Sequence, residues 1–337
     1  MKRRFRYLGP VVVLCILAAA MWLLYEQVKH YDPEKVMAAI RQTTPARLAA
    51  AVGLTVLNYL VLIFYDLVNI RYLGHHFRLR TIAMASLISY MVSNTFGMLL
   101  GGTAVRYRLY SSWGLSLVQV AELIALLGLT FWLGVFALAG LLLVVAPFRL
   151  PEWLQNHLGT TSVVPIGIVL LVFIGAYLAT TALWRRPIRI GSWQSQLPPL
   201  RLSLCQILIA SADITIAGGV LYVLLPSPSG IGFLSFLAVY LLGVVVAVIT
   251  HVPGQFGVLD LIILVLCNVQ NPEEASEGVL AAVLVYRVVY TLLPLLVGAV
   301  LLGLYELHLR KESLLSLIHI SEPTRLLSIS YAVFCLK

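Results

Sequence analysis

Long runs of apolar residues, separated by short polar stretches, recur along the whole chain. About 20 apolar residues cross the hydrocarbon core of a bilayer as a helix. Runs of roughly this length cover 8–25, 46–70, 117–146, 163–183, 202–225 and 278–304. Two more apolar stretches, 82–102 and 232–267, are interrupted near their middles by glycine, proline or polar residues. The pattern predicts an all-α polytopic membrane protein with about six full spans and two broken helical segments.

The first broken segment, 82–102, has basic residues on both sides. Arginines occur at 71, 78 and 80 before it and at 106 and 108 after it. Lysine and arginine are enriched in cytoplasmic loops, so both ends are expected in the cytoplasm, as is the basic N-terminus. The segment is then a re-entrant hairpin, and its middle is suited to a turn at Ser93–Gly97 and then at Gly101-Gly102. The alternative is a plain span with a few arginines on the unexpected side.

The second broken segment, 232–267, has the opposite sense. It follows a tight external turn at 226–230 and precedes an acidic stretch, 271–277, that lacks lysine and arginine. Its break runs from His251 to Asp260. Unwound backbone survives at membrane depth only where protein buries it or where it lines a cavity, and transporters build substrate sites from such breaks. The alternative is an ordinary loop that carries an aspartate. Two hairpins of opposite sense suggest an inverted arrangement around one central site.

Composition narrows the class of function. The chain is 61% hydrophobic and 11% charged, whereas soluble domains carry about 25% charged residues. The net charge of +9 comes from basic loops, which does not indicate nucleic-acid binding. Phosphate-binding loops, dinucleotide fingerprints, zinc-protease motifs and nucleophile elbows are all missing from the sequence. The four cysteines have no metal or disulfide spacing. We expect neither catalysis nor a cofactor or metal.

Charged residues nevertheless lie inside the apolar segments: Asp66, Glu122, Asp213, Asp260 and Arg287. Each costs about 2.5–3.5 kcal/mol at mid-bilayer on insertion scales, so these groups are expected to pair, to become neutral or to face water. Arg287 stays protonated and needs a carboxylate, carbonyl groups or an anionic ligand. Asp213, Asp260 and a lipid phosphate are the candidates. The alternative role is an ion pair that only holds helices together.

The span 46–70 also carries a polar stripe. Around an ideal helix, Tyr65 and Asn69 each fall within about 20° of Asn58, and Asp66 lies beside them. We expect this stripe to face the interior of the bundle, with Arg106 at the lip of the first hairpin.

Five motifs carry a resemblance to a known family. They are Tyr65-Asp66, Gly101-Gly102-Thr-Ala-Val-Arg106, Asp213 with Gly218-Gly219-Val-Leu-Tyr222, Pro253-Gly-Gln-Phe-Gly257-Val-Leu-Asp260, and Tyr286-Arg287-Val-Val-Tyr290-Thr-Leu-Leu-Pro294. In this order and spacing they resemble the N-terminal flippase half of the lysylphosphatidylglycerol synthetase/flippase family, the bacterial multiple peptide resistance factor. The resemblance covers nearly all of residues 1–310.

The resemblance implies a multi-pass protein of the bacterial inner membrane. It would move aminoacylated phosphatidylglycerol from the inner to the outer leaflet, which repels cationic antimicrobial peptides. The catalytic synthase half has no counterpart here, so the chain is not expected to be an enzyme. Expected partners are an aminoacylated or other anionic phospholipid, a separately encoded synthase and further copies of the chain. Transport of another anionic phospholipid or lipid carrier, or a scaffold for a synthase, is the alternative.

The resemblance also implies a set of residues along the lipid path. These are Tyr65, Asp66, Arg106, Asp213, Pro253, Gly254, Gly257, Asp260, Tyr286, Arg287 and Tyr290. The two arginines are expected to receive the lipid phosphate, and the three aspartates to balance the cationic aminoacyl group. The sequence departs from the family pattern at Gln255, where a second glycine is common, and at Asp213, where a glutamate is usual.

The predicted flippase-like domain covers residues 1–312. The tail, 313–337, has no span-length apolar run and resembles translated sequencing-adapter read-through. If the tail is such read-through, the natural gene can continue beyond Glu312.

Overall fold

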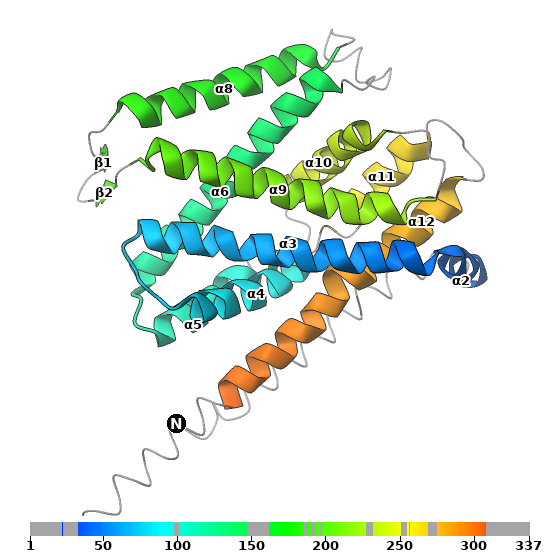
Figure 1. Ribbon diagram of the computed structural model, residues 1–337, viewed down its shortest axis with the longest axis horizontal. Coiled ribbons are helices and arrows are strands. Elements are labelled where there is room, and N and C mark those ends of the chain that lie inside the picture. Colours follow the sequence, from blue (N-terminus) through cyan, green and yellow to red (C-terminus); the bar gives the residue numbers. More distant parts are fainter. Residues whose placement is uncertain are drawn as a thin grey trace, which may run out of the picture.

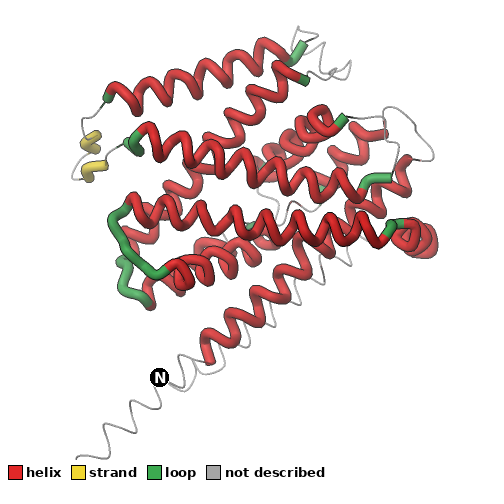
Figure 2. The backbone as a smooth tube through the Cα atoms, viewed as in Figure 1, coloured by secondary structure: helices red, strands yellow, loops and turns green. Residues whose placement is uncertain are grey.

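The structure is a computed structural model. It describes residues 22, 33–97, 101–146, 162–184, 188–190, 193–195, 197–226, 232–250, 255, 257–268 and 275–307. In this part of the chain, helices dominate (Figures 1 and 2). Those long and apolar enough to cross a membrane are α3 (Pro45–Tyr72), α6 (Leu117–Val145), α8 (Val164–Leu183), α9 (Leu200–Leu224) and the helix Gly278–Leu307. They match five predicted spans, and the sixth, 8–25, lies outside the described residues.

Shorter elements complete the bundle. The helices are α2 (Pro33–Gln42), α4 (Leu79–Phe96), α5 (Thr103–Ser112), α10 (Phe233–Ile249), α11 (Val258–Asn268) and α12 (Ala275–Tyr286). A π-helix, Arg287–Leu292, follows α12 without a break, and the chain stays helical to Leu307. Two short antiparallel strands, β1 (Ile188–Ile190) and β2 (Trp193–Ser195), lie between α8 and α9. The sequence pattern did not predict these strands.

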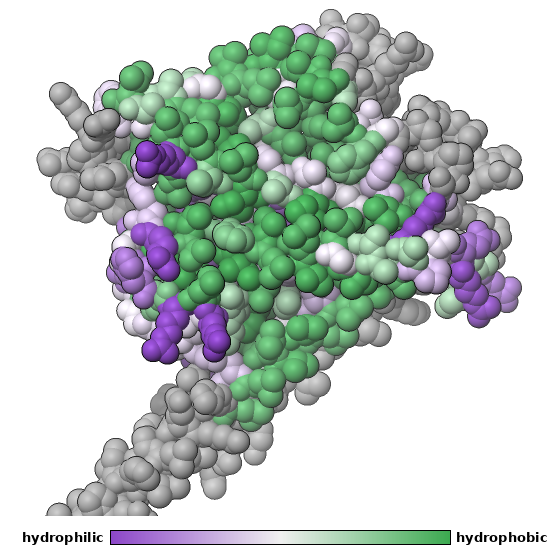
Figure 3. Space-filling model, in the orientation of Figure 1, coloured by the Kyte–Doolittle hydropathy of each residue, from purple (hydrophilic) through white to green (hydrophobic). Residues whose placement is uncertain are grey.

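The bundle has two polar ends and an apolar band between them. Hydrophilic side chains gather at the two ends of the view in Figure 3, and hydrophobic side chains cover most of the surface between them. An ion pair of 3.0 Å between Arg108 and Glu306 joins the end of α5 to the end of the last helix, which defines the basic end of the bundle. At the opposite end, Arg47 donates to the carbonyl of Leu225 over 3.3 Å. The band is the surface expected of a bilayer-spanning bundle.

The two broken segments form hairpins that enter the bundle from opposite ends (Figure 1). Phe77, before α4, packs its ring 6.3 Å from that of Trp113, after α5, so the α4–α5 hairpin begins and ends at the basic end. The α10–α11 hairpin follows α9 at the opposite end. There the chain returns to Gly278, where an added Cβ would lie 2.9 Å from Pro226. The opposite senses predicted from the loop charges are thus present.

The break in the first hairpin lies in the later part of the predicted turn region. Residues 93–95 remain helical, and α4 ends where Gly97 adopts a φ of 81°, a left-handed conformation that glycine reaches without strain. The second arm, α5, runs on to Ser112, so Arg106 belongs to the hairpin and not to a cytoplasmic loop. Arg106 was expected at the lip of this hairpin, and the structure places it deeper, fully buried, where the carboxylate of Asp66 neutralises its charge.

Small residues allow the helices to approach closely. A Cβ on Gly134 of α6 would overlap Ala210 of α9, and a Cβ on Gly102 would overlap the hydroxyl of Ser93. Close backbone approach at glycine and alanine is a main source of packing between helices in a bilayer. The first contact joins α6 to α9 and the second joins the two arms of the first hairpin, while α3 lies against α9 at the centre of the bundle and α8 lies at its periphery (Figure 1).

Candidate functional site

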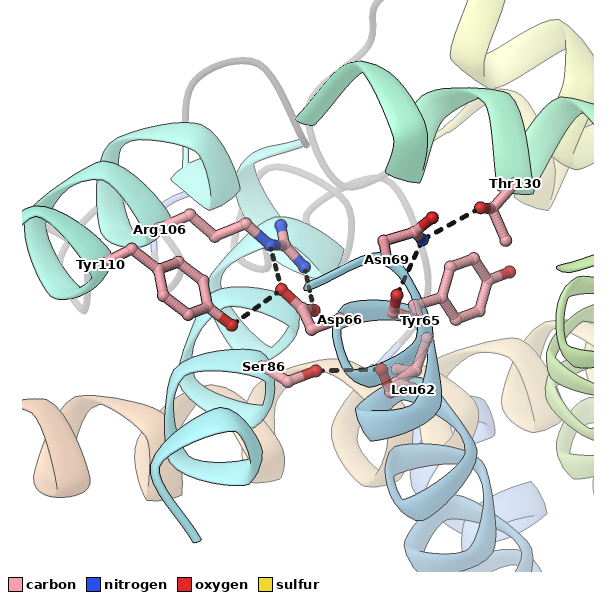
Figure 4. A network of polar contacts seen from close by, with 8 residues as sticks. All are labelled: Leu62, Tyr65, Asp66, Asn69, Ser86, Arg106, Tyr110 and Thr130. Carbon is pink, nitrogen blue, oxygen red and sulfur yellow. Dashed lines mark hydrogen bonds and ion pairs between the residues drawn. The ribbon is translucent and has the colours of Figure 1, made fainter. Parts of the chain in front are cut away.

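The first hairpin holds a completely buried ion pair. Arg106 of α5 donates from Nε and Nη2 to the two carboxylate oxygens of Asp66 on α3, over 3.2 and 3.1 Å, and neither side chain is exposed. The hydroxyl of Tyr110 donates to the same carboxylate over 3.1 Å (Figure 4). Two parallel bonds to a planar guanidinium offset much of the desolvation cost of the charges. The arrangement explains how apolar surroundings can hold the two groups as an ion pair.

The ion pair with Asp66 does not use every nitrogen of the Arg106 guanidinium. The guanidinium lies over the ring of Tyr90, 4.4 Å from its centroid, and Nη1 has no hydrogen-bond partner among the described residues. The hydroxyl of Ser93 is also unpaired there. Nη1 lies 3.2 Å from the position that a Cβ on Gly102 would take, and Ser93 Oγ occupies that position. Two buried donors thus lie close together at the hairpin break, a chemistry suited to a phosphate oxygen.

The second hairpin holds another ion pair. Arg287 donates from Nη2 to Asp260 Oδ1 over 2.7 Å and to the carbonyl oxygen of Gln255 over 2.9 Å. Asp260 lies in the first turn of α11 and accepts from the backbone N–H of Gly257 over 2.9 Å. Of the partners expected for this arginine, the structure selects Asp260 and a backbone carbonyl. Pro253 and Gly254, also predicted for the site, lie outside the described residues.

Gln255 has an unusual backbone. Its φ of 59° lies in the left-handed region, and Gly257 follows with a φ of 78°. A residue with a side chain pays about 1–2 kcal/mol in this conformation, whereas glycine does not. The conformation orients the carbonyl of Gln255 toward Arg287. The glycine that the family pattern favours at this position has a direct conformational reason.

The π-helix beside Arg287 was not predicted from the sequence. Pro294 has no backbone N–H, so the carbonyl of Tyr290, four residues earlier, loses its usual helical donor. The hydroxyl of Tyr59 on α3 donates to that carbonyl over 3.2 Å. π-Helical turns are rare and occur frequently at functional sites. The sequence signal was the proline itself, which ends no helix here and instead accompanies a widened turn.

Asp213, in the middle of α9, has neutral donors around it. Asn58 Nδ2 donates to Oδ1 and to the main-chain carbonyl of Asp213, both over 2.8 Å, and the hydroxyl of Tyr65 donates to Oδ2 over 2.9 Å. Tyr290 donates to Asn58 Oδ1 over 2.8 Å, which fixes the orientation of the amide. Within the described part of the chain, Asp213 has no lysine, arginine or histidine in ion-pair contact. Its side chain is only partly buried.

Tyrosine side chains connect Asp213 with both ion pairs. On one side, Tyr65 packs against Tyr90 at 5.7 Å between ring centroids, and Tyr90 lies beneath Arg106. On the other side, the ring of Tyr290 stacks on Tyr286, the residue before Arg287, at 5.0 Å. Asp213 therefore lies between the two hairpins, joined to each through aromatic contacts.

The structure thus brings together eight of the predicted site residues in the interior of the bundle. They are Tyr65, Asp66, Arg106, Asp213, Asp260, Tyr286, Arg287 and Tyr290. These residues do not form a single charged cluster, because each arginine pairs with its own carboxylate. Sequence reasoning missed Tyr59, Tyr90, Tyr110 and Tyr240, whose only signal is an aromatic ring in an apolar span. Among the described residues there is no group of three potential metal ligands.

Comparison with known proteins places this arrangement in a family. The family described as "Lysylphosphatidylglycerol synthase TM region" matches residues 8–298. The chain belongs to this family. One relative is the Synechocystis protein named "Uncharacterized protein slr0712", 37% identical over 90% of this chain and 94% of its own length. Another is "Inner membrane protein YbhN" of Escherichia coli, 32% identical over 91% of this chain and 95% of its own length. The family region contains both hairpins and Asp213.

Proposed function

We propose that the chain moves aminoacylated phosphatidylglycerol, such as lysylphosphatidylglycerol, from the inner to the outer leaflet of the bacterial inner membrane, which gives resistance to cationic antimicrobial peptides. The multi-pass helical bundle and the family support this function, and the name of the Escherichia coli relative supports the location. The observation that carries the proposal is Asp213, a mid-span carboxylate with hydrogen-bond donors but no cationic side chain among the described residues.

The charges of the site favour a cargo with an amine. Asp66 with Arg106, and Asp260 with Arg287, cancel within each pair. Asp213 leaves a formal charge of −1 in the middle of the bundle. Its oxygens already accept from Asn58 and Tyr65, and an ionised carboxylate has further acceptor positions for the ammonium group of an aminoacyl lipid. Unmodified phosphatidylglycerol has no group that would neutralise this site.

The lipid phosphate has a second, separate partner. Nη1 of Arg106 and the hydroxyl of Ser93 are unpaired donors at the break of the hairpin that opens to the basic end. By the positive-inside rule this end faces the cytoplasm, together with the N-terminus. The phosphate would enter there, the ammonium would reach Asp213, and the second hairpin would release the lipid on the outer side. The acyl chains would stay in the bilayer, so only the head group needs a polar path.

The decisive experiment measures the amine of the cargo in the outer leaflet. Cells that already make lysylphosphatidylglycerol are labelled intact with a membrane-impermeant amine reagent, with and without residues 1–312. We expect exposed lipid to rise at constant total lipid, and Asp213→Asn to abolish the rise. Glu306→Gln is the matched control, because it removes a carboxylate from the more exposed pair at the basic end. Unchanged exposure with the protein present in the membrane would contradict the proposal.

One observation favours a second candidate, transport of an anionic phospholipid without an amine. The unpaired donors at Arg106 and Ser93 need only a phosphate. In that case Arg106→Lys would lower transport, whereas Asp213→Asn would leave it unchanged. A scaffold that recruits a separately encoded synthase, alone or as a homo-oligomer, would retain its effect in both variants, since it requires only that the chain folds. The same labelling experiment therefore separates the three functions.

A further inference from the structure

The lack of a described cationic partner at Asp213 bears on the energy source of transport. The inference drawn from it rests on the proposed function. An ionised carboxylate in the middle of an apolar bundle has a high free energy unless a cation accompanies it. The two ion pairs are complete without Asp213, and no described cationic side chain reaches it. When the cargo leaves, the site therefore needs another positive charge. Water on either side of the membrane supplies protons.

We infer that Asp213 binds a proton and the ammonium group of the cargo alternately, so that the chain exchanges one proton for one lipid. When the cargo leaves on the outer side, a proton from the outer water forms an O–H bond with the carboxylate, and the ammonium departs as an intact cation. On the inner side this O–H bond breaks, the proton passes to the inner water, and the next ammonium takes its place.

The hydrogen bonds around the carboxylate identify the oxygen that takes the proton. Asn58 Nδ2 also donates to the main-chain carbonyl of Asp213, which is an acceptor only, so the amide must keep its NH₂ group toward Oδ1. A proton on Oδ1 would face this donor. Tyr65 contacts Oδ2 through a hydroxyl, which accepts as well as donates. Protonation at Oδ2 then requires only that the Tyr65 hydroxyl turn from donor to acceptor.

The other titratable groups near Asp213 in the described part of the chain place no cationic side chain in ion-pair contact with it. Tyr59 and Tyr65 of α3, Tyr90 of α4, Tyr240 of α10 and Tyr290 of the π-helix lie within electrostatic reach of the carboxylate. The other helices that pack against α9 carry Glu122 in the second turn of α6, Tyr177 on α8, which pairs with Ser203 near the start of α9, and Tyr286 of α12, which pairs with Tyr240. Arg106 and Arg287 are each held by their own carboxylate.

The charge balance makes the exchange obligatory. With a proton or with an ammonium group at Asp213, the centre of the bundle is neutral, whereas the empty site carries −1. Only the two neutral forms avoid moving a bare charge through low-dielectric surroundings, so an empty site is not expected to change sides. Lysylphosphatidylglycerol carries two ammonium groups and one phosphate, a net charge of +1. Exchange of this lipid for a proton therefore moves no net charge and depends on the pH difference alone.

The test uses the full chain in vesicles of phosphatidylglycerol that contain a little lysylphosphatidylglycerol. A pH difference is imposed, collapsed with an ionophore, and the exposed amine is labelled at one common pH. For one-to-one exchange the lipid should accumulate on the acidic side by up to about tenfold per pH unit. An imposed potassium potential should have no effect. Asp213→Glu should retain the dependence on pH, and Asp213→Asn should lose it.

The outcomes separate the exchange from the flippase. Lipid movement that ignores the pH difference would overturn the exchange and leave the flippase intact. If no lipid moves under any gradient, the proposed function fails, and an infrared measurement of the protein in pure phosphatidylglycerol vesicles still tests proton binding. We expect a protonated carboxyl band that disappears as the pH rises and is absent in Asp213→Asn. The lack of this band in the wild-type protein at every pH would overturn the inference.

Discussion

Each hairpin carries a buried charge that pairs with the opposite charge on a neighbouring span, and the signs are exchanged between the two hairpins. In the α4–α5 hairpin, the second arm carries the arginine, Arg106, and the neighbouring span supplies the carboxylate of Asp66. In the α10–α11 hairpin, the second arm carries the carboxylate of Asp260, and the neighbouring span supplies Arg287. Each hairpin is therefore fastened to the helix beside it by one buried ion pair. In each hairpin the charges of the pair cancel, whichever member the second arm carries.

The two ion pairs differ in their enclosure and in their geometry. The Asp66–Arg106 pair has two parallel bonds, a tyrosine donor and an aromatic ring beneath the guanidinium, and its exposure is zero. The Asp260–Arg287 pair is joined through Nη2 of the arginine, and its side chains are 6% and 3% exposed. It also depends on the backbone of Gln255 in a left-handed conformation. The complete enclosure of the first pair and the left-handed backbone beside the second lead us to expect that the first hairpin is the more rigid anchor and that the second opens more readily.

The largest expected effect of a substitution is at the first pair. Asp66→Asn leaves the buried guanidinium of Arg106 without a compensating charge, and breaking a buried pair on one side costs about 3–5 kcal/mol. We expect the thermal midpoint of the purified protein in detergent to fall further than in the Arg287, Tyr59 or Gln255 variants described below. A midpoint close to that of the wild-type protein would show that this pair is not the anchor.

A smaller effect on stability is expected at the second pair. Arg287→Ala removes hydrogen bonds to a carboxylate and to a carbonyl, and a hydrogen bond to a charged group is worth about 1.5–3 kcal/mol. Asp260 keeps its bond from the N–H of Gly257, which limits the damage. Lipid exposure should nevertheless be lost. If Arg287→Ala destabilised the protein as much as Asp66→Asn, the difference between the hairpins would not hold.

The next largest loss of stability is expected at the π-helix beside the second hairpin, and it tests how that helix is held. Tyr59→Phe removes the buried hydroxyl that donates to the carbonyl of Tyr290 and accepts from Asn94 Nδ2, at a cost of about 1–3 kcal/mol. Tyr305→Phe is the matched control, because its hydroxyl contacts Ser112 at the solvated basic end. Thermal unfolding of both variants gives the comparison. Equal midpoints would mean that the carbonyl finds another partner.

The smallest expected effect is a gain in stability. Gln255→Gly removes the left-handed strain of a residue with a side chain and should stabilise the second hairpin by about 1 kcal/mol. Gln255→Ala, which keeps the strain, is the control and should bring no such gain. A small rise of the thermal midpoint in the glycine variant alone is the expected result. A fall would show that the Gln255 side chain contributes more than the backbone strain costs.

The sequence predicted most of the architecture, because membrane spans and loop charges follow from local composition. The interior stripe of α3 was also predictable, since Asn58, Tyr65 and Asn69 repeat with the helical period, and the structure buries all three. Asp260 was one of two carboxylates expected as partners for Arg287. These predictions depend on the cost of polar groups in lipid, which acts on every residue separately.

Other features depend on which helices meet, and local composition carries little of that information. The basic residue at 106 looked like a loop marker because its partner, Asp66, lies 40 positions earlier on another helix. The donors of Asp213 come from α3, 148 and 155 positions away, and only the close packing of α3 on α9 brings them there. The π-helix depends on a local residue and on a distant one. Pro294 removes one backbone hydrogen bond, and the hydroxyl of Tyr59 on α3 replaces it.

The order of the charges along the chain has a consequence for synthesis. In both buried pairs the carboxylate comes first: Asp66 precedes Arg106 by 40 residues, and Asp260 precedes Arg287 by 27. A ribosome adds about 5–20 residues per second, so each aspartate waits seconds for its partner. An isolated carboxyl group in apolar surroundings lowers its free energy by taking up a proton. An arginine has no neutral form to adopt and stays charged. The chain therefore presents to the membrane first the member of each pair that tolerates being alone.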